Sequence, residues 1–265
     1  KNIFVGNAGT TMRFLCSFAA LCLGETIIDG SWRMRQRPLN DLIDGLSPLG
    51  VEIISQNENG CPPVKIKGGG IDGGETEMNG DKSSQYFTSI LMSSPYAKKD
   101  VLIKVNGELT SRPYIDLTID LMRIFGVNVE NNSYSSFFIK SGNGYKAREY
   151  TIESDMTSAT YFFAAAAITG GKVKVKNINI STMQGDIKFV DILKKMGCIV
   201  LKGENFIEVE GGGLTGINVN MNEMPDAVQT LAVTSLFAKG ETRITGVSNL
   251  RIKETDRIKA LATEL

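Results

Sequence analysis

The sequence predicts an α/β fold in which one unit of about 72 residues recurs along the chain. Two interleaved patterns predict it: a short strand that follows an apolar run, and a helical pattern that ends on glycine before another strand. At 265 residues the chain is long enough for one large domain or two ordinary ones. Because solenoid repeats are only ~20–50 residues long, we expect a fold assembled from several copies of one α/β unit.

The first pattern is a short strand entered from the end of a helix. Its clearest copies are "LGETIIDG" at 23–30 and "KGETRITG" at 239–246, with weaker copies at 98–107 and 170–178. Four markers lie 75, 72 and 69 residues apart: Gly24, Lys99, Gly171 and Gly240. Four preceding helices are therefore expected in equivalent places, beginning near Gly9, Ser83, Thr157 and Pro225.

The second pattern is a helix that ends on glycine and continues into alternating strand residues. Its copies are "LIDGLSPLGVEI" at 42–53, "TIDLMRIFGVNV" at 118–129 and "FVDILKKMGCIV" at 189–200. Gly50, Gly126 and Gly197 stand where a helix C-terminus needs a left-handed residue. Together the patterns predict helix, strand, helix, strand, strand. About three and a half such units are visible. Because the chain starts at Lys1 and ends in the helical pattern "DRIKALATEL", we expect a piece of a longer protein.

Composition excludes several classes of function. Apolar residues make up 42% and charged residues 22% of the chain, the balance of a globular protein. The longest apolar stretch, 14–23, is shorter than the ~20 residues that span a bilayer, so no membrane partner is expected. The formal net charge is zero, which argues against a nucleic-acid partner.

Histidine and cysteine usage narrows the chemistry. The chain has no histidine, which removes His-dependent triads and His-based metal sites within this chain. The four cysteines have no zinc-binding spacing, and Cys16 and Cys22 are expected to pack in the core. Any acid or base must therefore be Asp, Glu, Lys, Tyr or Cys.

Two stretches near the start are candidate anion sites. "VGNAGTTMRFL" at 5–15 is a glycine-rich turn entering a helix, whose free N–H groups and dipole favour an anion. The alternative is a tight turn before a buried helix. In "SWRMRQRP", Arg33, Arg35 and Arg37 would share one face of an extended segment and could clamp an anion. The alternative is a solvated basic loop.

Two more helix starts carry polar side chains. Ser83, Ser84 and Gln85 precede an apolar helix, and "SRPYID" places Ser111 and Tyr114 before another. Such hydroxyls either cap the helix or hold a phosphate, and the residues alone do not decide between these roles.

The final stretch, "SNLRIKETDRIKAL" at 248–261, crowds charged residues at a strand-to-helix transition. Lys253 and Arg257 would share a helix face if the helix has begun there, and a carboxylate between cations is favoured in its ionised form. The alternative is a surface helix with ordinary ion pairs. Upstream, Asp226 follows a proline at a helix start and is either a dipole stabiliser or a base.

Together these motifs resemble the 5-enolpyruvylshikimate-3-phosphate (EPSP) synthase family. The resemblance runs in order over essentially the whole chain through "GNAGTTMR", "RMRQRP", "SSQYFTSILM", "SRPYIDLT", "QGDIKFVDILKKMG", "MPDAVQTLA" and "NLRIKETDRIKA". The chain lacks the family's N-terminal lysine-serine-arginine segment and its C-terminal segment with a further arginine and lysine. Both absences fit the expectation of a piece cut at each end.

The resemblance implies a fold. Members have the enolpyruvyl transferase fold, a two-domain inside-out α/β barrel in which each domain contains three βαβαββ units. The second crossover between the domains would fall near Glu153. Residues 1–153 would then be most of one globular domain and residues 154–265 part of the other.

The resemblance also implies a reaction and its residues. The enolpyruvyl group of phosphoenolpyruvate would pass to the 5-hydroxyl of shikimate 3-phosphate, releasing phosphate, with no metal or organic cofactor. Residues implied to hold shikimate 3-phosphate are Ser83, Ser84, Ser111, Tyr114, Asn249 and Lys253. Residues implied at phosphoenolpyruvate are Gly9, Arg33, Gln85, Glu254 and Arg257. Asp226, Glu254 and Lys253 would be catalytic, with Asp226 taking the hydroxyl proton and Glu254 shuttling a proton at the methylene carbon.

Further expectations are a cytoplasmic monomer and glyphosate as an inhibitor at the phosphoenolpyruvate site. Phe14 stands where many members carry a proline, beside the position that governs access of glyphosate. One alternative is UDP-N-acetylglucosamine enolpyruvyl transferase, which shares the fold and uses a loop cysteine. Here only Cys61 lies in a loop-like setting, in a turn before a strand. The other alternative is an inactive ligand-binding fragment that lacks the terminal cations.

Overall fold

A computed structural model describes all residues of the chain, 1–265. The chain divides into two compact units, which are described separately. The first contains Lys1–Arg148 together with Ile252–Asp256, and the second contains Glu149–Arg251 together with Arg257–Leu265. The domain boundary expected near Glu153 stays a prediction. None of the helices is long and apolar enough to cross a bilayer.

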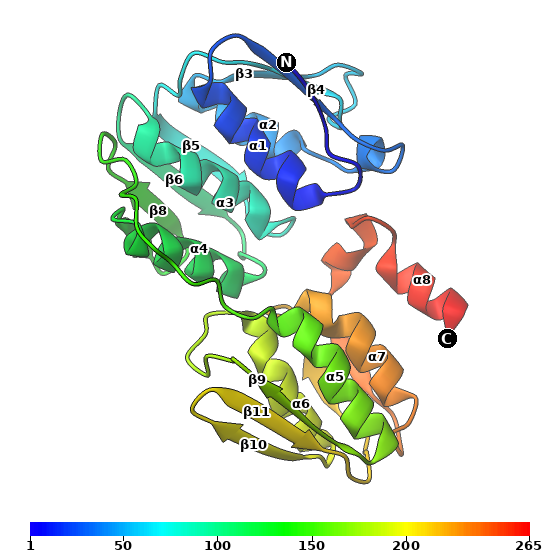
Figure 1. The fold of residues 1–265 in the computed structure, drawn as a ribbon. Coiled ribbons are helices and arrows are strands. Elements are labelled where there is room, and N and C mark those ends of the chain that lie inside the picture. Colours follow the sequence, from blue (N-terminus) through cyan, green and yellow to red (C-terminus); the bar gives the residue numbers. More distant parts are fainter. The chain divides into compact units, whose positions relative to one another are not determined.

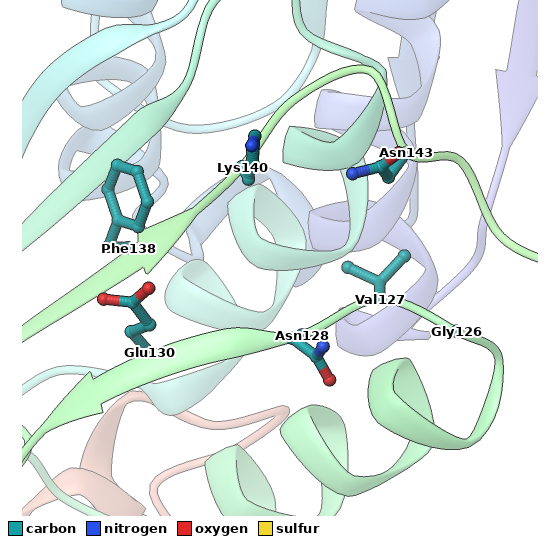
Figure 2. A pocket seen from close by; sticks show the side chains of 7 residues that line it. All are labelled: Gly126, Val127, Asn128, Glu130, Phe138, Lys140 and Asn143. Atoms are coloured by element: carbon teal, nitrogen blue, oxygen red, sulfur yellow. The ribbon is translucent and has the colours of Figure 1, made fainter.

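The first unit contains two copies of one βαβαββ order (Figure 1). The first copy comprises β1 (Asn2–Phe4), α1 (Gly9–Leu21), β2 (Glu25–Asp29), α2 (Asn40–Leu46), β3 (Glu52–Ser55) and β4 (Val64–Lys67). The second comprises β5 (Gly74–Asn79), α3 (Ser84–Ser93), β6 (Val101–Asn106), α4 (Arg112–Ile124), β7 (Val129–Asn132) and β8 (Ser136–Ile139).

The two sheets of this unit have the same topology. Their strand orders are β1-β2-β4-β3 and β5-β6-β8-β7. In each, the first two strands pair in parallel across a helix, and the other two pairings are antiparallel. This shared order confirms the repeat predicted from the sequence.

The second unit follows the same plan. After α5 (Met156–Thr169) come β9 (Lys172–Lys176), α6 (Phe189–Met196), β10 (Ile199–Gly203) and β11 (Phe206–Glu210). Then follow β12 (Asn218–Asn220), α7 (Val228–Ser235), β13 (Arg243–Thr245) and α8 (Arg257–Glu264). The β9, β11 and β10 strands form an antiparallel sheet, and β12 pairs with β13 in parallel. The helix starts at Gly9, Ser84 and Met156, and the 3-10 turn at Pro225, lie where the repeat predicts them.

The predicted helix-ending glycines adopt the expected backbone. Gly50, Gly126 and Gly197 have φ of 82°, 90° and 116°, a region that residues with a Cβ rarely enter. Each reverses the chain so that the following strand can return along the sheet. The pattern of helix, glycine and strand in the sequence is therefore confirmed.

Each unit has its own apolar core. In the first unit α3 packs between α1 and α4 (Figure 1). Side chains such as Leu42, Phe87 and Phe137 are fully buried there. In the second unit α5 packs on α6, α7 and the β9–β11 sheet, with Phe163 and Leu193 fully buried. Cys16 is buried as expected, whereas Cys22 follows the last turn of α1 and is only half-buried.

Candidate active site

The turn before α1 leaves the start of that helix open to a ligand. Ala8 occupies the N-cap position and forms no side-chain cap, so the first-turn N–H groups have no hydroxyl or carboxylate acceptor from this position. The chain enters the helix directly at Gly9, as the sequence predicts. An uncapped helix start with a positive dipole end can hold an anion.

Gln85 of α3 lies beside this helix start and is held on both sides of its amide. Arg13 Nη1 donates to Gln85 Oε1 at 2.5 Å, and Gln85 Nε2 donates to Thr10 Oγ1 at 3.0 Å. Arg13 is 4% exposed, and its guanidinium lies 5.2 Å from the centre of the Tyr86 ring. Arg13 and Thr10 were not among the predicted site residues. The repeat could have indicated them, because they stand about one repeat before Gln85 on an equivalent helix.

Ser83 acts as the helix cap at the start of α3. Its Oγ accepts from the Gln85 backbone N–H at 3.3 Å, and both Ser83 and Ser84 are buried. Capping was the structural alternative in the sequence analysis, and the structure shows that role for Ser83. The cap also orients the first turn that carries Gln85.

The three arginines of "RMRQRP" do not share one face. Residues 34–36 form a 3-10 helix rather than an extended segment, so alternate side chains diverge. Arg35 is exposed and ion-paired with Asp29, whereas Arg37 is 5% exposed and donates to the Asn7 carbonyl at 3.2 Å. The expectation of one arginine face is therefore wrong.

Arg33 bonds to the backbone of Lys253 and Glu254, which belong to the first unit. Its Nε donates to the Glu254 carbonyl at 3.1 Å, and its Nη2 donates to the Lys253 carbonyl at 3.1 Å. Nη1 donates to Gln36 Oε1 at 3.2 Å. These contacts fix the guanidinium against the backbone that carries two predicted catalytic side chains.

Ser111 and Tyr114 stand at the start of α4. Ser111 has φ of 55°, a left-handed conformation that costs a non-glycine residue roughly 1–2 kcal/mol. It is 5% exposed, and its side chain forms no cap hydrogen bond. Backbone strain at a buried hydroxyl is a feature found at functional sites.

In the second unit Asp226 pairs with Arg257. Asp226 lies in the 3-10 turn Pro225–Ala227 that leads into α7, and its Oδ1 accepts from Arg257 Nη1 at 2.6 Å. Both side chains are only partly exposed, 32% and 17%. The Gln229 amide is assigned so that its oxygen accepts from Arg257 Nε at 3.1 Å and its nitrogen donates to the Asp226 carbonyl. The acid at this helix start is thus held next to a fixed cation.

The expected helix face shared by Lys253 and Arg257 does not form near the end of the chain. Residues 248–252 form a 3-10 helix and α8 begins only at Arg257, so Lys253 and Arg257 do not share a helix face. Asn249 in that 3-10 helix is 8% exposed, and its Oδ1 is buried with no hydrogen-bond partner. A buried amide oxygen without a partner is uncommon and is suited to accept from a bound hydroxyl.

The predicted residues belong to both units. Those of the first unit are Gly9, Arg33, Ser83, Ser84, Gln85, Ser111, Tyr114, Lys253 and Glu254, and those of the second are Asp226, Asn249 and Arg257. No group of three or more acidic or thiol side chains is arranged to hold a metal ion. Within the first unit, the helix starts at Gly9, Ser84 and Arg112 are suited to bind anionic groups. Within the second unit, the Asp226 carboxylate is paired with Arg257.

This repeated βαβαββ architecture is that of the enolpyruvyl transferases, and comparisons with known proteins identify the family. The family model for EPSP synthase (3-phosphoshikimate 1-carboxyvinyltransferase) matches residues 1–265. The chain belongs to the EPSP synthase family.

Individual relatives agree with the family match. The chain is 50% identical over 267 residues to the 3-phosphoshikimate 1-carboxyvinyltransferase of Marinomonas sp. (strain MWYL1), covering 100% of this chain and 62% of that protein. It is 48% identical over 266 residues to the protein of that name from Salmonella arizonae, covering 99% and 62%. An EPSP synthase structure from Acinetobacter baumannii matches with TM-score 0.74 and 27% identity over 99% of this chain and 60% of that one. The chain thus spans about 62% of the length of these curated relatives.

Proposed function

We propose that the protein containing this chain transfers the enolpyruvyl group of phosphoenolpyruvate to the 5-hydroxyl of shikimate 3-phosphate and releases phosphate. The observation that carries the proposal is the uncapped helix start at Gly9 with Gln85 held beside it. Both substrates carry a phosphate and a carboxylate, which such helix starts and arginines bind. Family membership supplies the reaction class.

The proposed residue roles follow the family resemblance. Gly9, Arg33, Gln85, Glu254 and Arg257 are proposed to contact phosphoenolpyruvate, while Asn249 and Lys253 contact shikimate 3-phosphate. Shikimate 3-phosphate is also proposed to contact four residues at helix starts: Ser83, Ser84, Ser111 and Tyr114. Two observations support this assignment. The buried Oδ1 of Asn249 has no hydrogen-bond partner, and the side chain of the strained Ser111 forms no cap hydrogen bond.

The proposed proton chemistry uses two carboxylates of this chain, which itself contains no histidine. Asp226 is proposed as the base for the 5-hydroxyl, and its carboxylate forms an ion pair with Arg257. Glu254 is proposed to move a proton to and from the methylene carbon, and its neighbour Lys253 is also proposed to be catalytic. No cofactor takes part in this scheme.

The decisive experiment measures phosphate release from phosphoenolpyruvate in the whole protein, with shikimate 3-phosphate or UDP-N-acetylglucosamine as acceptor. Release with only the first acceptor is expected. Release with only the second would favour UDP-N-acetylglucosamine enolpyruvyl transferase, and binding without release would favour a ligand-binding protein. Cys61, the loop cysteine expected from the sequence, is poorly suited to the second reaction, because it is 9% exposed and burial raises the pKa of its thiol.

Variants of the two carboxylates test the proton steps. Asp226→Ala and Glu254→Gln should each lower turnover ~10²–10⁴-fold, the range of a lost acid or base. Glu254→Gln should also slow hydrogen exchange at the methylene carbon, measured by single-turnover kinetics in deuterated water. Glu223→Gln is the matched control, since this exposed carboxylate pairs with Lys188 just before the Asp226 turn. Wild-type exchange in both site variants would make the two carboxylates structural.

The remaining assignments are also part of the proposal. Residues 1–153 and 154–265 are proposed to belong to the two globular domains of a monomeric cytoplasmic enzyme. Glyphosate is proposed to compete with phosphoenolpyruvate near Gly9. These assignments rest on the family resemblance, and sedimentation together with glyphosate inhibition of phosphate release would test the monomer and the inhibitor.

A further inference from the structure

Arg37 fills the space beside Gly9. A Cβ built on Gly9 would lie 2.5 Å from Nη2 and 2.6 Å from Nη1 of Arg37, closer than real Cβ contacts occur. The same guanidinium donates from Nη1 to the Asn7 carbonyl at 3.2 Å. Arg37 therefore contacts the turn at two neighbouring points, just before the start of α1.

The position of Arg37 is fixed by the chain around it. Arg37 ends the 3-10 helix Met34–Gln36, and its backbone N–H donates to the Met34 carbonyl at 3.0 Å. Pro38 follows, and Tyr86 of α3 donates from its hydroxyl to the Pro38 carbonyl at 2.7 Å. Tyr86 is itself 1% exposed, so this anchor lies inside the core.

The other side of the turn is held from the same helix. Gln85, the neighbour of Tyr86, donates to Thr10 immediately after Gly9, and Arg13 stacks over the Tyr86 ring. The turn is thus fixed at Asn7 by Arg37 and at Thr10 by Gln85. Gln85 of α3 bonds directly to Thr10, and the adjacent Tyr86 bonds to Pro38, the residue after Arg37.

We propose that Arg37 is a positioning residue for the phosphoenolpyruvate site, and that its guanidinium occupies the space that a side chain at residue 9 would need. By holding the Asn7 carbonyl it orients the N–H groups at the start of α1 toward the anion. This inference rests on the proposed function. It differs from a role in ligand contact, because Arg37 acts through the turn, and a side chain at position 9 would displace its guanidinium.

A double-mutant cycle in the whole protein tests the proposal. Arg37→Met should raise KM for phosphoenolpyruvate about tenfold and leave KM for shikimate 3-phosphate within about twofold. Gly9→Ala should raise KM for phosphoenolpyruvate about tenfold in the wild-type background. In the Arg37→Met background, where the guanidinium is gone, the same Gly9→Ala change should cost less than about threefold. Arg37→Lys should recover part of the loss, because it restores a donor for the Asn7 carbonyl.

Arg35→Met is the matched control, since Arg35 belongs to the same five-residue segment, 33–37, but is exposed and bound to Asp29. It should leave both KM values within about twofold. An equal effect of Gly9→Ala in both backgrounds would overturn the inference, as would a parallel rise of both KM values in Arg37→Met.

Thermal unfolding of the same variants separates this inference from the proposed function. Gly9→Ala should lower Tm in the wild-type background and have less effect in the Arg37→Met and Arg37→Lys backgrounds, with or without catalysis. A wild-type protein that releases no phosphate overturns the proposed function. If Gly9→Ala lowers Tm equally in the wild-type and Arg37→Met backgrounds, the contact between Arg37 and residue 9 is overturned, even if the enzyme is active.

Discussion

At the scale of single residues, three arginines within five positions meet three environments. Arg33 bonds to two backbone carbonyls, Arg35 pairs with Asp29 in solvent, and Arg37 is buried. Alternation in the sequence predicts one shared face, but a 3-10 helix turns each residue by about a third of a circle. Local pattern therefore identifies the cations, while their roles depend on a backbone twist that the pattern does not encode.

Arg33→Ala should lower kcat/KM for phosphoenolpyruvate by roughly 10–150-fold in the whole protein. The range corresponds to ~1.5–3 kcal/mol for hydrogen bonds to a charged group. Arg35→Ala should change kcat/KM less than about fivefold, because an exposed ion pair contributes ~1 kcal/mol or less. Steady-state kinetics of the two variants decides, and equal losses would contradict a substrate contact by Arg33.

Asp29 should give the first unit a pH-dependent increment of stability. Arg35 bonds to both of its oxygens and the Gly30 N–H bonds to one, so the pKa of Asp29 lies below its ordinary value. A lowered folded pKa means that the increment is present above pH ~4 and is lost as pH falls through the folded pKa.

The increment is expected to be about 1 kcal/mol or less, because Arg35 is exposed. Urea unfolding of wild type and Asp29→Asn should differ at pH 7, and the difference should disappear as pH falls below the lowered folded pKa of Asp29. A difference that stays constant from pH 7 to pH 3 would show that the Asp29 charge does not contribute.

At the scale of elements, hydroxyl pairs recur where equivalent helices meet. Ser17 and Ser89 join α1 to α3 at 2.6 Å, and Thr88 and Thr118 join α3 to α4 at 2.9 Å. In the second unit Thr160 and Thr230 join α5 to α7 at 3.2 Å. In each pair one hydroxyl already donates to a backbone carbonyl, so the other must donate across the helix contact.

Ser89→Ala should therefore destabilise the protein more than Ser17→Ala. Ser89 donates to the Arg13 carbonyl and accepts from Ser17, so its loss leaves a fully buried Ser17 hydroxyl without that acceptor, at a cost of ~1–3 kcal/mol. Ser17→Ala removes only a donor and should cost ~0.5–1.5 kcal/mol. Urea unfolding measures both, with exposed Ser47→Ala as control. A larger loss in Ser17→Ala would reverse the donor assignment.

The sequence predicts the elements well because their signals are local. The glycines at 50, 126 and 197 end helices as expected, and the strands after them lie where alternation indicates. Contacts between repeats are not local: Arg13, Thr10 and Gln85 meet only because α1 and α3 pack side by side. The site residues found by motif are thus candidates, and their supporting residues appear only in three dimensions.

At the scale of the whole molecule, the chain has two cores rather than one. Leu42 of α2 is fully buried in the first, and Leu193 of α6 is fully buried in the second. A domain unfolds cooperatively when its own core is lost, and proteins with several domains need not unfold in one step. The division into cores therefore predicts separable unfolding transitions.

Leu42→Ala should lower the Tm of one calorimetric transition of the whole protein, and Leu193→Ala the Tm of another. Each removes a buried side chain and should cost ~2–5 kcal/mol within its own core. The double variant should show the two shifts together without extra loss, because the sites share no core partners. If either single variant moved every transition equally, the two cores would be one cooperative unit, and the division of the chain at Arg148 would not describe its folding.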